Sequence, residues 1–121
     1  MDDPAMETPD WHVPVRDGLR FLPGPGGERF AAVFAHGSLD VEVYAPRGHD
    51  PQTPHARDEV YVVASGTGTF VRDGERVAFG PGDFLFVPAG VPHRFEDFSD
   101  DFVTWVLFYG PEGGEADESA L

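Results

Sequence analysis

Two histidines and one glutamate are the residues of this sequence whose types and positions suit metal chemistry. His55 and Glu59 flank the point where a loop becomes a strand-like run, and His93 follows a Pro-Ala-Gly turn much later in the chain. Imidazole nitrogen and carboxylate oxygen together suit Fe(II), Mn, Zn, Ni or Cu. Two histidines and one carboxylate also leave coordination positions open for water, substrate or dioxygen. These three residues are therefore candidate ligands of one divalent transition metal.

Short strands must position these residues, because strand-like runs alternate with turn-forming glycine and proline. The runs have the spacing of an all-β sandwich or barrel and cover residues 29–35, 39–45, 59–64, 67–72, 75–79, 84–87, 91–95 and 102–109. Asp73-Gly74 is a strong signal for a two-residue hairpin turn. We expect no helix, and at most a short turn at residues 17–22.

The alternation of side chains along two of these runs places the candidate ligands together. Glu59, Tyr61 and Val63 share one face of their strand, and so do His93 and Phe95. Alternate residues of barrel strands point inward, so distant segments bring side chains together there. The expected site is polar at its centre with aromatic side chains around it, as small-molecule pockets usually are.

Two runs, 84–87 and 102–109, are apolar on both faces. A strand with one face in water would alternate between apolar and polar residues. We therefore expect the second face to be covered, either by the N-terminal segment or by a second copy of the chain. The second copy is our preferred reading, which predicts a homodimer.

The composition points to one acidic domain. The 121 residues suit a single core, residues 11–111, between flexible acidic tails at 1–10 and 112–121. The net charge is −14, and without the tails the body is still negative, which disfavours nucleic acid and anionic membranes as partners.

Without cysteine there are no thiolate ligands. No apolar stretch reaches membrane-span length and the N-terminus is acidic, so we expect a cytoplasmic protein.

The candidate ligands lie within two motifs that resemble those of the cupin superfamily. The first motif is a glycine, a His-x-His pair, a glutamate and a second glycine, represented here by Gly48, His55, Glu59 and Gly66. The second motif is a glycine, Pro-x-Gly and a histidine, represented by Gly82, Pro88, Gly90 and His93 in register. The similarity spans roughly residues 29–109, most of the chain, and two motifs together are far more specific than one.

This resemblance implies an antiparallel double-stranded β-helix, which is a jelly roll. It also implies that His55, Glu59 and His93 bind a metal and that a small organic molecule occupies the barrel. Cupins include dioxygenases and isomerases, so either activity is a hypothesis for this chain. The sequence shows no second residue pair typical of acid–base catalysis, and we assign no catalytic base.

One position departs from the cupin pattern. Thr53 stands where cupins usually have the first histidine of the pair, and Gly48 is one residue closer to His55 than usual. A hydroxyl is a poor ligand for these metals. The alternatives for the fourth position are the amide oxygen of Gln52, if the loop bulges, or His49, or water.

This loss also favours a second hypothesis, a non-catalytic module that binds a small molecule with or without metal. Arg57 is close enough in sequence to reach a substrate carboxylate from the pocket mouth, although a surface charge is the simpler interpretation.

Overall fold

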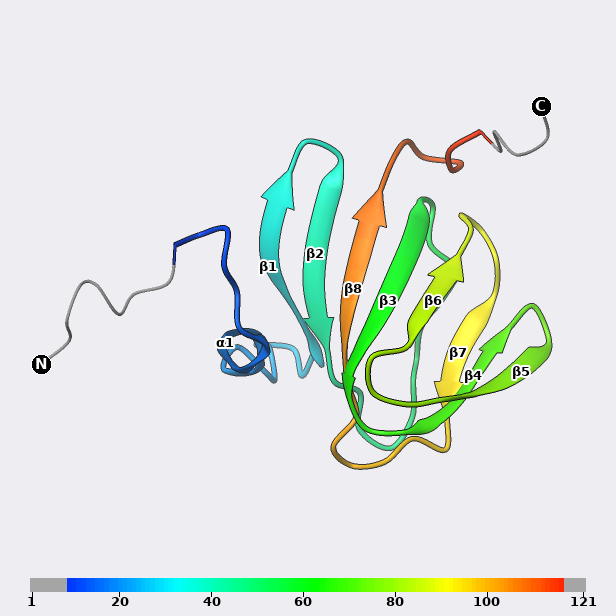
Figure 1. The fold of residues 1–121 in the computed structure, drawn as a ribbon, viewed down its shortest axis with the longest axis horizontal. Coiled ribbons are helices and arrows are strands. Elements are labelled where there is room, and N and C mark those ends of the chain that lie inside the picture. Colours follow the sequence, from blue (N-terminus) through cyan, green and yellow to red (C-terminus); the bar gives the residue numbers. More distant parts are fainter. Residues whose placement is uncertain (1–8, 117–121) are drawn as a thin grey trace, which may run out of the picture.

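The computed structural model describes residues 9–116 as two antiparallel sheets that face each other (Figure 1). One sheet has five strands in the order β1-β2-β8-β3-β6, and the other has three in the order β5-β4-β7. The strands are β1 Phe30–His36, β2 Leu39–Tyr44, β3 Asp58–Ser65, β4 Gly68–Arg72, β5 Glu75–Phe79, β6 Phe84–Val87, β7 His93–Glu96 and β8 Val103–Tyr109. The predicted all-β jelly roll is confirmed. Residues 1–8 and 117–121, which are most of the first predicted tail and half of the second, lie outside the described residues.

The expectation of no helix is wrong for one short segment. Helix α1, Val15–Leu19, forms a little more than one turn and lies against β1 and β2. Gly18 permits this close approach, because a Cβ atom there would lie 2.6 Å from Cγ2 of Val43. A single turn is too short to show a helical period in the sequence. No helix among the described residues is long and apolar enough to cross a membrane.

The core lies between the two sheets, on the inner face of the larger one. The fully buried side chains of β3 are Glu59, Tyr61 and Val63, which confirms that these residues share the inward face. His93 and Phe95 of β7 are buried in the same way. The Phe95 ring lies 4.8 Å from that of Tyr61, edge to face. The candidate polar site is therefore enclosed by packed aromatic rings, as predicted.

Two turns that contain glycine connect strands around this core, and each needs its glycine for a different reason. Asp73 and Gly74 both have positive φ, 49° and 85°, as a type I′ hairpin turn requires, and they join β4 to β5. Gly66 has φ of 88° between β3 and β4, and it is buried. A Cβ atom at Gly66 would lie 2.4 Å from the Cα atom of Phe102, whereas one at Gly74 would meet nothing within 4 Å.

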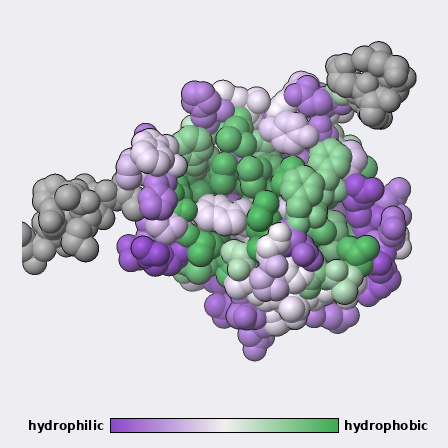
Figure 2. All heavy atoms as spheres, in the orientation of Figure 1, coloured by the Kyte–Doolittle hydropathy of each residue, from purple (hydrophilic) through white to green (hydrophobic). Residues whose placement is uncertain are grey.

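The outer face of the five-stranded sheet is broadly apolar. Figure 2 shows hydrophobic side chains gathered over the strands of this sheet. The pairing of β3 with β6 and β8 places Val62, Phe84 and Trp105 side by side on this face. Phe84 is 65% exposed, whereas Val43 of β2, next to α1, is completely buried. The N-terminal segment thus covers only the β1–β2 part of the face that the sequence predicts to be covered.

The two glycine turns generate a first prediction. Gly74→Ala should cost about 1–2 kcal/mol of unfolding free energy, the cost of a left-handed backbone for an alanine. Gly66→Ala should cost clearly more, because the new methyl group also displaces the Phe102 backbone. Urea denaturation of both variants measures the difference, and equal losses would show that the close approach at Gly66 contributes nothing.

The homodimer stays a prediction, and we place its contact on the outer apolar face. Phe84→Glu should then shift the protein toward monomer in size-exclusion chromatography with light scattering, because a charge replaces an exposed aromatic ring. Val77→Glu is the control, since Val77 is 42% exposed on the other sheet. A wild-type mass of 13.2 kDa, that of one chain, would reject the dimer.

Candidate metal centre

His55, Glu59 and His93 come together because the turn before β7 is hydrogen-bonded to the segment before β3. His55 precedes β3, Glu59 is the second residue of β3, and His93 is the first residue of β7. The backbone N–H of Gly90, in the turn before β7, donates a 2.7 Å hydrogen bond to the carbonyl oxygen of His55. Gly90 has φ of 79°, which a glycine adopts without strain. The second sequence motif is thereby fastened to the first.

The donor atoms of the three residues have the spacing of a metal-binding set. Nε2 of His93 lies 3.1 Å from Oε1 of Glu59, and Nε2 of His55 lies 3.8 Å from Oε2 of the same carboxylate. All three residues offer ligand atoms within 4.8 Å of one another. Atoms that each bind one ion at about 2.0–2.2 Å are separated by distances of this order.

The environment of the Glu59 carboxylate is the strongest physical argument for a metal ion at this site. Its side chain is fully buried, and neither oxygen accepts a hydrogen bond from residues 9–116. An ionised carboxylate in such a place is costly unless a positive charge lies beside it. A metal ion held by Glu59 and the two imidazoles would supply that charge, so the residues present fit the group.

His93 is oriented to present a lone pair to the cluster. A carbonyl oxygen only accepts, so Nδ1 of His93 carries the hydrogen that it donates to Val91, at 2.9 Å. Burial by itself lowers the pKa of His93, but the Glu59 carboxylate and the Val91 carbonyl outweigh it and raise the pKa. A metal binds the neutral imidazole, so this raised pKa of His93 makes metal binding weaker as the pH falls.

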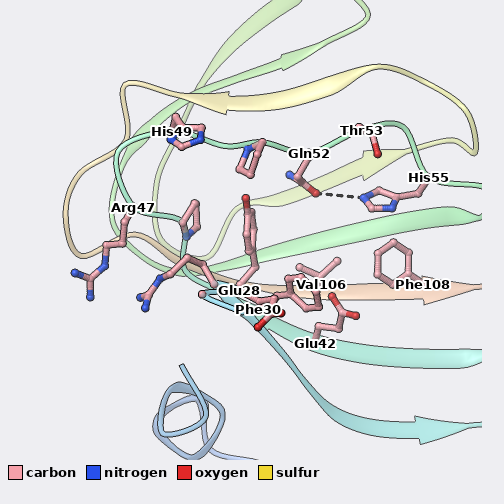
Figure 3. A pocket seen from close by; sticks show the side chains of 15 residues that line it. Glu28, Phe30, Glu42, Arg47, His49, Gln52, Thr53, His55, Val106 and Phe108 are labelled. Atoms are coloured by element: carbon pink, nitrogen blue, oxygen red, sulfur yellow. Dashed lines mark hydrogen bonds between the residues drawn. The ribbon is translucent and has the colours of Figure 1, made fainter. Parts of the chain in front are cut away.

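Gln52 turns its amide oxygen toward the same cluster. Its Oε1 lies 3.3 Å from Nε2 of His55, as the dashed line in Figure 3 marks, and accepts a 2.9 Å hydrogen bond from the Tyr61 hydroxyl. Its Nε2 donates to Oδ2 of Asp50 at 2.8 Å, which fixes the orientation of the amide. Burial, and next the charge of Glu59, raise the pKa of Tyr61, so this hydroxyl stays protonated and able to donate.

Asp50 organises this loop, and the sequence analysis did not identify it. The carboxylate is buried and accepts hydrogen bonds from the Tyr44 hydroxyl, from the side chain and backbone of Gln52, and from the backbone N–H of Phe95. It therefore joins β2, the loop and β7. Its position directly before Pro51 was the available signal, but Asp-Pro pairs are common in loops.

The other residues singled out from the sequence lie elsewhere. Thr53 and His49 are exposed and line the neighbouring pocket without belonging to the ligand set. Arg57 is held at the beginning of β2: it pairs with Asp40 at 2.7 Å and donates to the carbonyl oxygens of Ser38 and Gly110. It does not line the pocket that reaches the candidate ligands.

A pocket of about 730 Å³ adjoins the cluster on its Gln52 and His55 side. His55 is the exposed member of the set, with 34% of its side chain accessible, whereas Glu59 and His93 are buried. The His55 ring also contacts Phe108 edge to face at 5.0 Å. The lining comes from β1, β2, β8 and the loop before β3, and comprises Gly27, Glu28, Arg29, Phe30, Glu42, Tyr44, Pro46, Arg47, His49, Pro51, Gln52, Thr53, His55, Val106 and Phe108.

Comparison with known proteins gives one family and several distant relatives. An uncharacterised protein of Streptomyces coelicolor is 43% identical over 63 residues, which is 52% of this chain and 60% of that protein. Dimethylsulfoniopropionate lyase DddQ of Ruegeria pomeroyi is 35% identical over 92 residues, which is 74% of this chain but 43% of the lyase. The chain thus spans only about half the length of these curated relatives.

The solved structures support the fold. A cupin-2 domain containing protein from Shewanella frigidimarina superposes with a TM-score of 0.62 at 15% identity, covering 81% of this chain and 94% of that one. At that identity the likeness shows the fold alone. The family model for the cupin domain, Cupin_2, matches residues 40–109, more than half of the chain, and this range contains all three candidate ligands. The chain belongs to the cupin domain family Cupin_2.

Proposed function

We propose that this chain binds one divalent transition metal through His55, Glu59 and His93 and is an enzyme that acts on a small organic molecule in the adjoining pocket. The observation that carries the proposal is the fully buried Glu59 carboxylate, which accepts no hydrogen bond within the described part of the chain and has two imidazole nitrogens beside it. Cupins commonly bind a transition metal, and this set fits Fe, Mn, Zn, Ni or Cu.

A bound metal supplies Lewis acidity or redox chemistry at the end of the pocket. The residues of this chain bind and orient the substrate around it. His55 and Gln52 form the boundary between the buried carboxylate and the pocket, so a substrate approaches the site from their side. The apolar side chains of Val106 and Phe108 line the same wall, and they exclude water from the reacting molecule.

The reaction class is the finer part of the proposal. Dioxygenation and isomerisation follow from the family resemblance, and the relative named as a lyase adds elimination from a small organic molecule as a third candidate. A non-catalytic binding module remains the alternative, and the absence of a histidine at Thr53 favours it. Assays of the metal-loaded protein distinguish an enzyme from a binding module, because an enzyme converts a bound compound to product. Oxygen uptake during the reaction is the specific test for dioxygenation.

The metal prediction is one bound ion per chain. Glu59→Gln should abolish binding, because it removes the negative charge while keeping the shape of the side chain, and His55→Ala and His93→Ala should do the same. His49→Ala is the matched control, an exposed histidine of the same pocket outside the ligand set. Elemental analysis and titration calorimetry with Mn²⁺, Fe²⁺, Zn²⁺, Ni²⁺ and Cu²⁺ measure the stoichiometry.

Two results would contradict the proposal. The first is a wild-type protein that binds none of the five metals, which would leave the non-catalytic hypothesis. The second is a Glu59→Gln variant that remains folded and binds metal as the wild type does. Circular dichroism of each variant separates loss of metal from loss of fold.

We also propose that the amide oxygen of Gln52 takes the fourth position. Gln52→Ala should lower metal affinity roughly tenfold, and Asp50→Asn should weaken it as well, because partners of ligands typically contribute 10–100-fold. Thr53→Ala is the control, because Thr53 is the neighbouring residue and its side chain is exposed. Equal affinities for Gln52→Ala and Thr53→Ala in calorimetry would assign the position to water instead.

A further inference from the structure

Two arginines of the pocket lack the acidic partners that other arginines of this chain have. Arg20, Arg57, Arg76 and Arg94 each form a salt bridge with an aspartate or glutamate. Arg29 and Arg47 form none with residues 9–116, although the chain has 22 acidic residues and a net charge of −14. In so acidic a chain, two unpaired cations in one pocket indicate a binding site for an anion from outside.

The two guanidinium groups lie close enough to affect each other. Burial, and next the positive charge of Arg47, lower the pKa of Arg29. Toward residues 9–116, Arg29 uses only its Nε–H, in a 2.8 Å hydrogen bond to the Ala45 carbonyl oxygen, so its two terminal amino groups are left for a ligand. Like charges held together in this way repel each other, and a shared anion between them would relieve the repulsion.

The nearest acid of the pocket is already occupied. Glu28 adjoins Arg29 in sequence, but one of its oxygens accepts a 3.0 Å hydrogen bond from the backbone N–H of Gly26, which turns the carboxylate into the preceding turn. Glu42, the other acid of the lining, has its pKa raised, first by burial and next by the charge of Glu59. Neither acid forms a salt bridge with the arginine pair in the described residues.

The pocket lining between Arg47 and His55 is mainly apolar, with Glu42 as an acid beside Val106 and Phe108 (Figure 3). In Figure 3, Arg47 lies at one end of the pocket and His55 and Phe108 lie at the other. Phe30, Val106 and Phe108 line the pocket, with Tyr44 and two prolines of the loop. A ligand that reaches both ends therefore needs an apolar body with an anionic group at one end.

We infer that Arg29 and Arg47 form a carboxylate subsite, and that the pocket takes a small organic monocarboxylate whose apolar body extends toward His55. A guanidinium matches the two oxygens of a carboxylate in geometry as well as charge. A phosphate dianion fits less well, because Glu28 and Glu42 also line the pocket and the whole chain repels a second negative charge. This inference rests on the proposed function for the role of the pocket, and it names the class of substrate.

The test is titration calorimetry with hexanoate as the probe, because it has an apolar body and one carboxylate. The wild type should bind hexanoate, with affinity that falls as salt is added, and should bind neither hexylamine nor inorganic phosphate. Arg29→Gln and Arg47→Gln should each weaken binding at least tenfold, because each removes charge-assisted hydrogen bonds. Arg16→Gln is the control, an exposed arginine outside the pocket that removes the same charge.

Metal loading separates this inference from the proposed function. The Arg47→Gln variant should retain its metal while losing hexanoate, and the Glu59→Gln variant should lose metal while retaining hexanoate. If hexanoate binding requires metal and is unaffected by the arginine changes, the carboxylate binds the ion directly and the subsite is rejected. Inorganic phosphate that binds as tightly as hexanoate would overturn the assignment to carboxylates.

Arg47→Gln keeps the test decisive even if Arg29→Gln fails to fold. The Arg47 side chain is exposed and makes no hydrogen bond to the described residues, so its replacement removes only the charge. Arg29→Lys adds a second check, because lysine keeps the charge but not the planar pair of donors. Full affinity in Arg47→Gln would overturn the proposal.

Discussion

A buried carboxylate without a hydrogen-bond donor is the constraint around which this cupin domain is built. Glu59 lies on the inner face of β3, completely buried, and the described chain gives its oxygens no hydrogen bond. Protein interiors rarely leave an acid in this state, because the loss of water is not offset. A cation at the Glu59 oxygens would offset this cost, which is the role that we propose for a metal ion shared with His55 and His93.

The surrounding structure serves to keep electron-rich atoms directed at one point. The Gly90–His55 backbone hydrogen bond joins the two halves of the ligand set, and the Val91 carbonyl sets the tautomer of His93. Asp50 holds the amide of Gln52 so that its oxygen faces inward. Together these contacts fix the orientation of the donor atoms, as the partners of metal ligands do in metal sites.

The pocket complements this centre in charge. Of its acids, Glu28 accepts a hydrogen bond from a backbone N–H, and burial raises the pKa of Glu42. Arg47 lies at the end of the pocket far from His55 (Figure 3), and its charge acts on Arg29. A molecule in the pocket therefore meets positive charge at one end, and the Phe108 ring and the candidate metal ligand His55 at the other. This polarity is the basis on which we propose a ligand with one anionic end.

The sequence predicted the parts of this account that depend on period and local spacing. Alternation placed Glu59 and Tyr61 on one inward face, and the motif around Gly90 predicted that His93 would reach His55. Asp50 and the pair Arg29 and Arg47 were missed, because their roles arise from contacts between segments distant in sequence, and no period marks them. Helix α1 was missed for a different reason: a single turn is stabilised by packing on Val43 and not by its own pattern.

The most direct measurement of the central claim is anomalous X-ray scattering from crystals of the protein grown with one of the candidate metals. We expect a single strong anomalous peak in contact with Glu59, His55 and His93, with the Gln52 amide oxygen beside it. A map without a peak at the Glu59 carboxylate, in crystals where soaking has placed the metal elsewhere, would contradict it. The metal centre would then have to be abandoned.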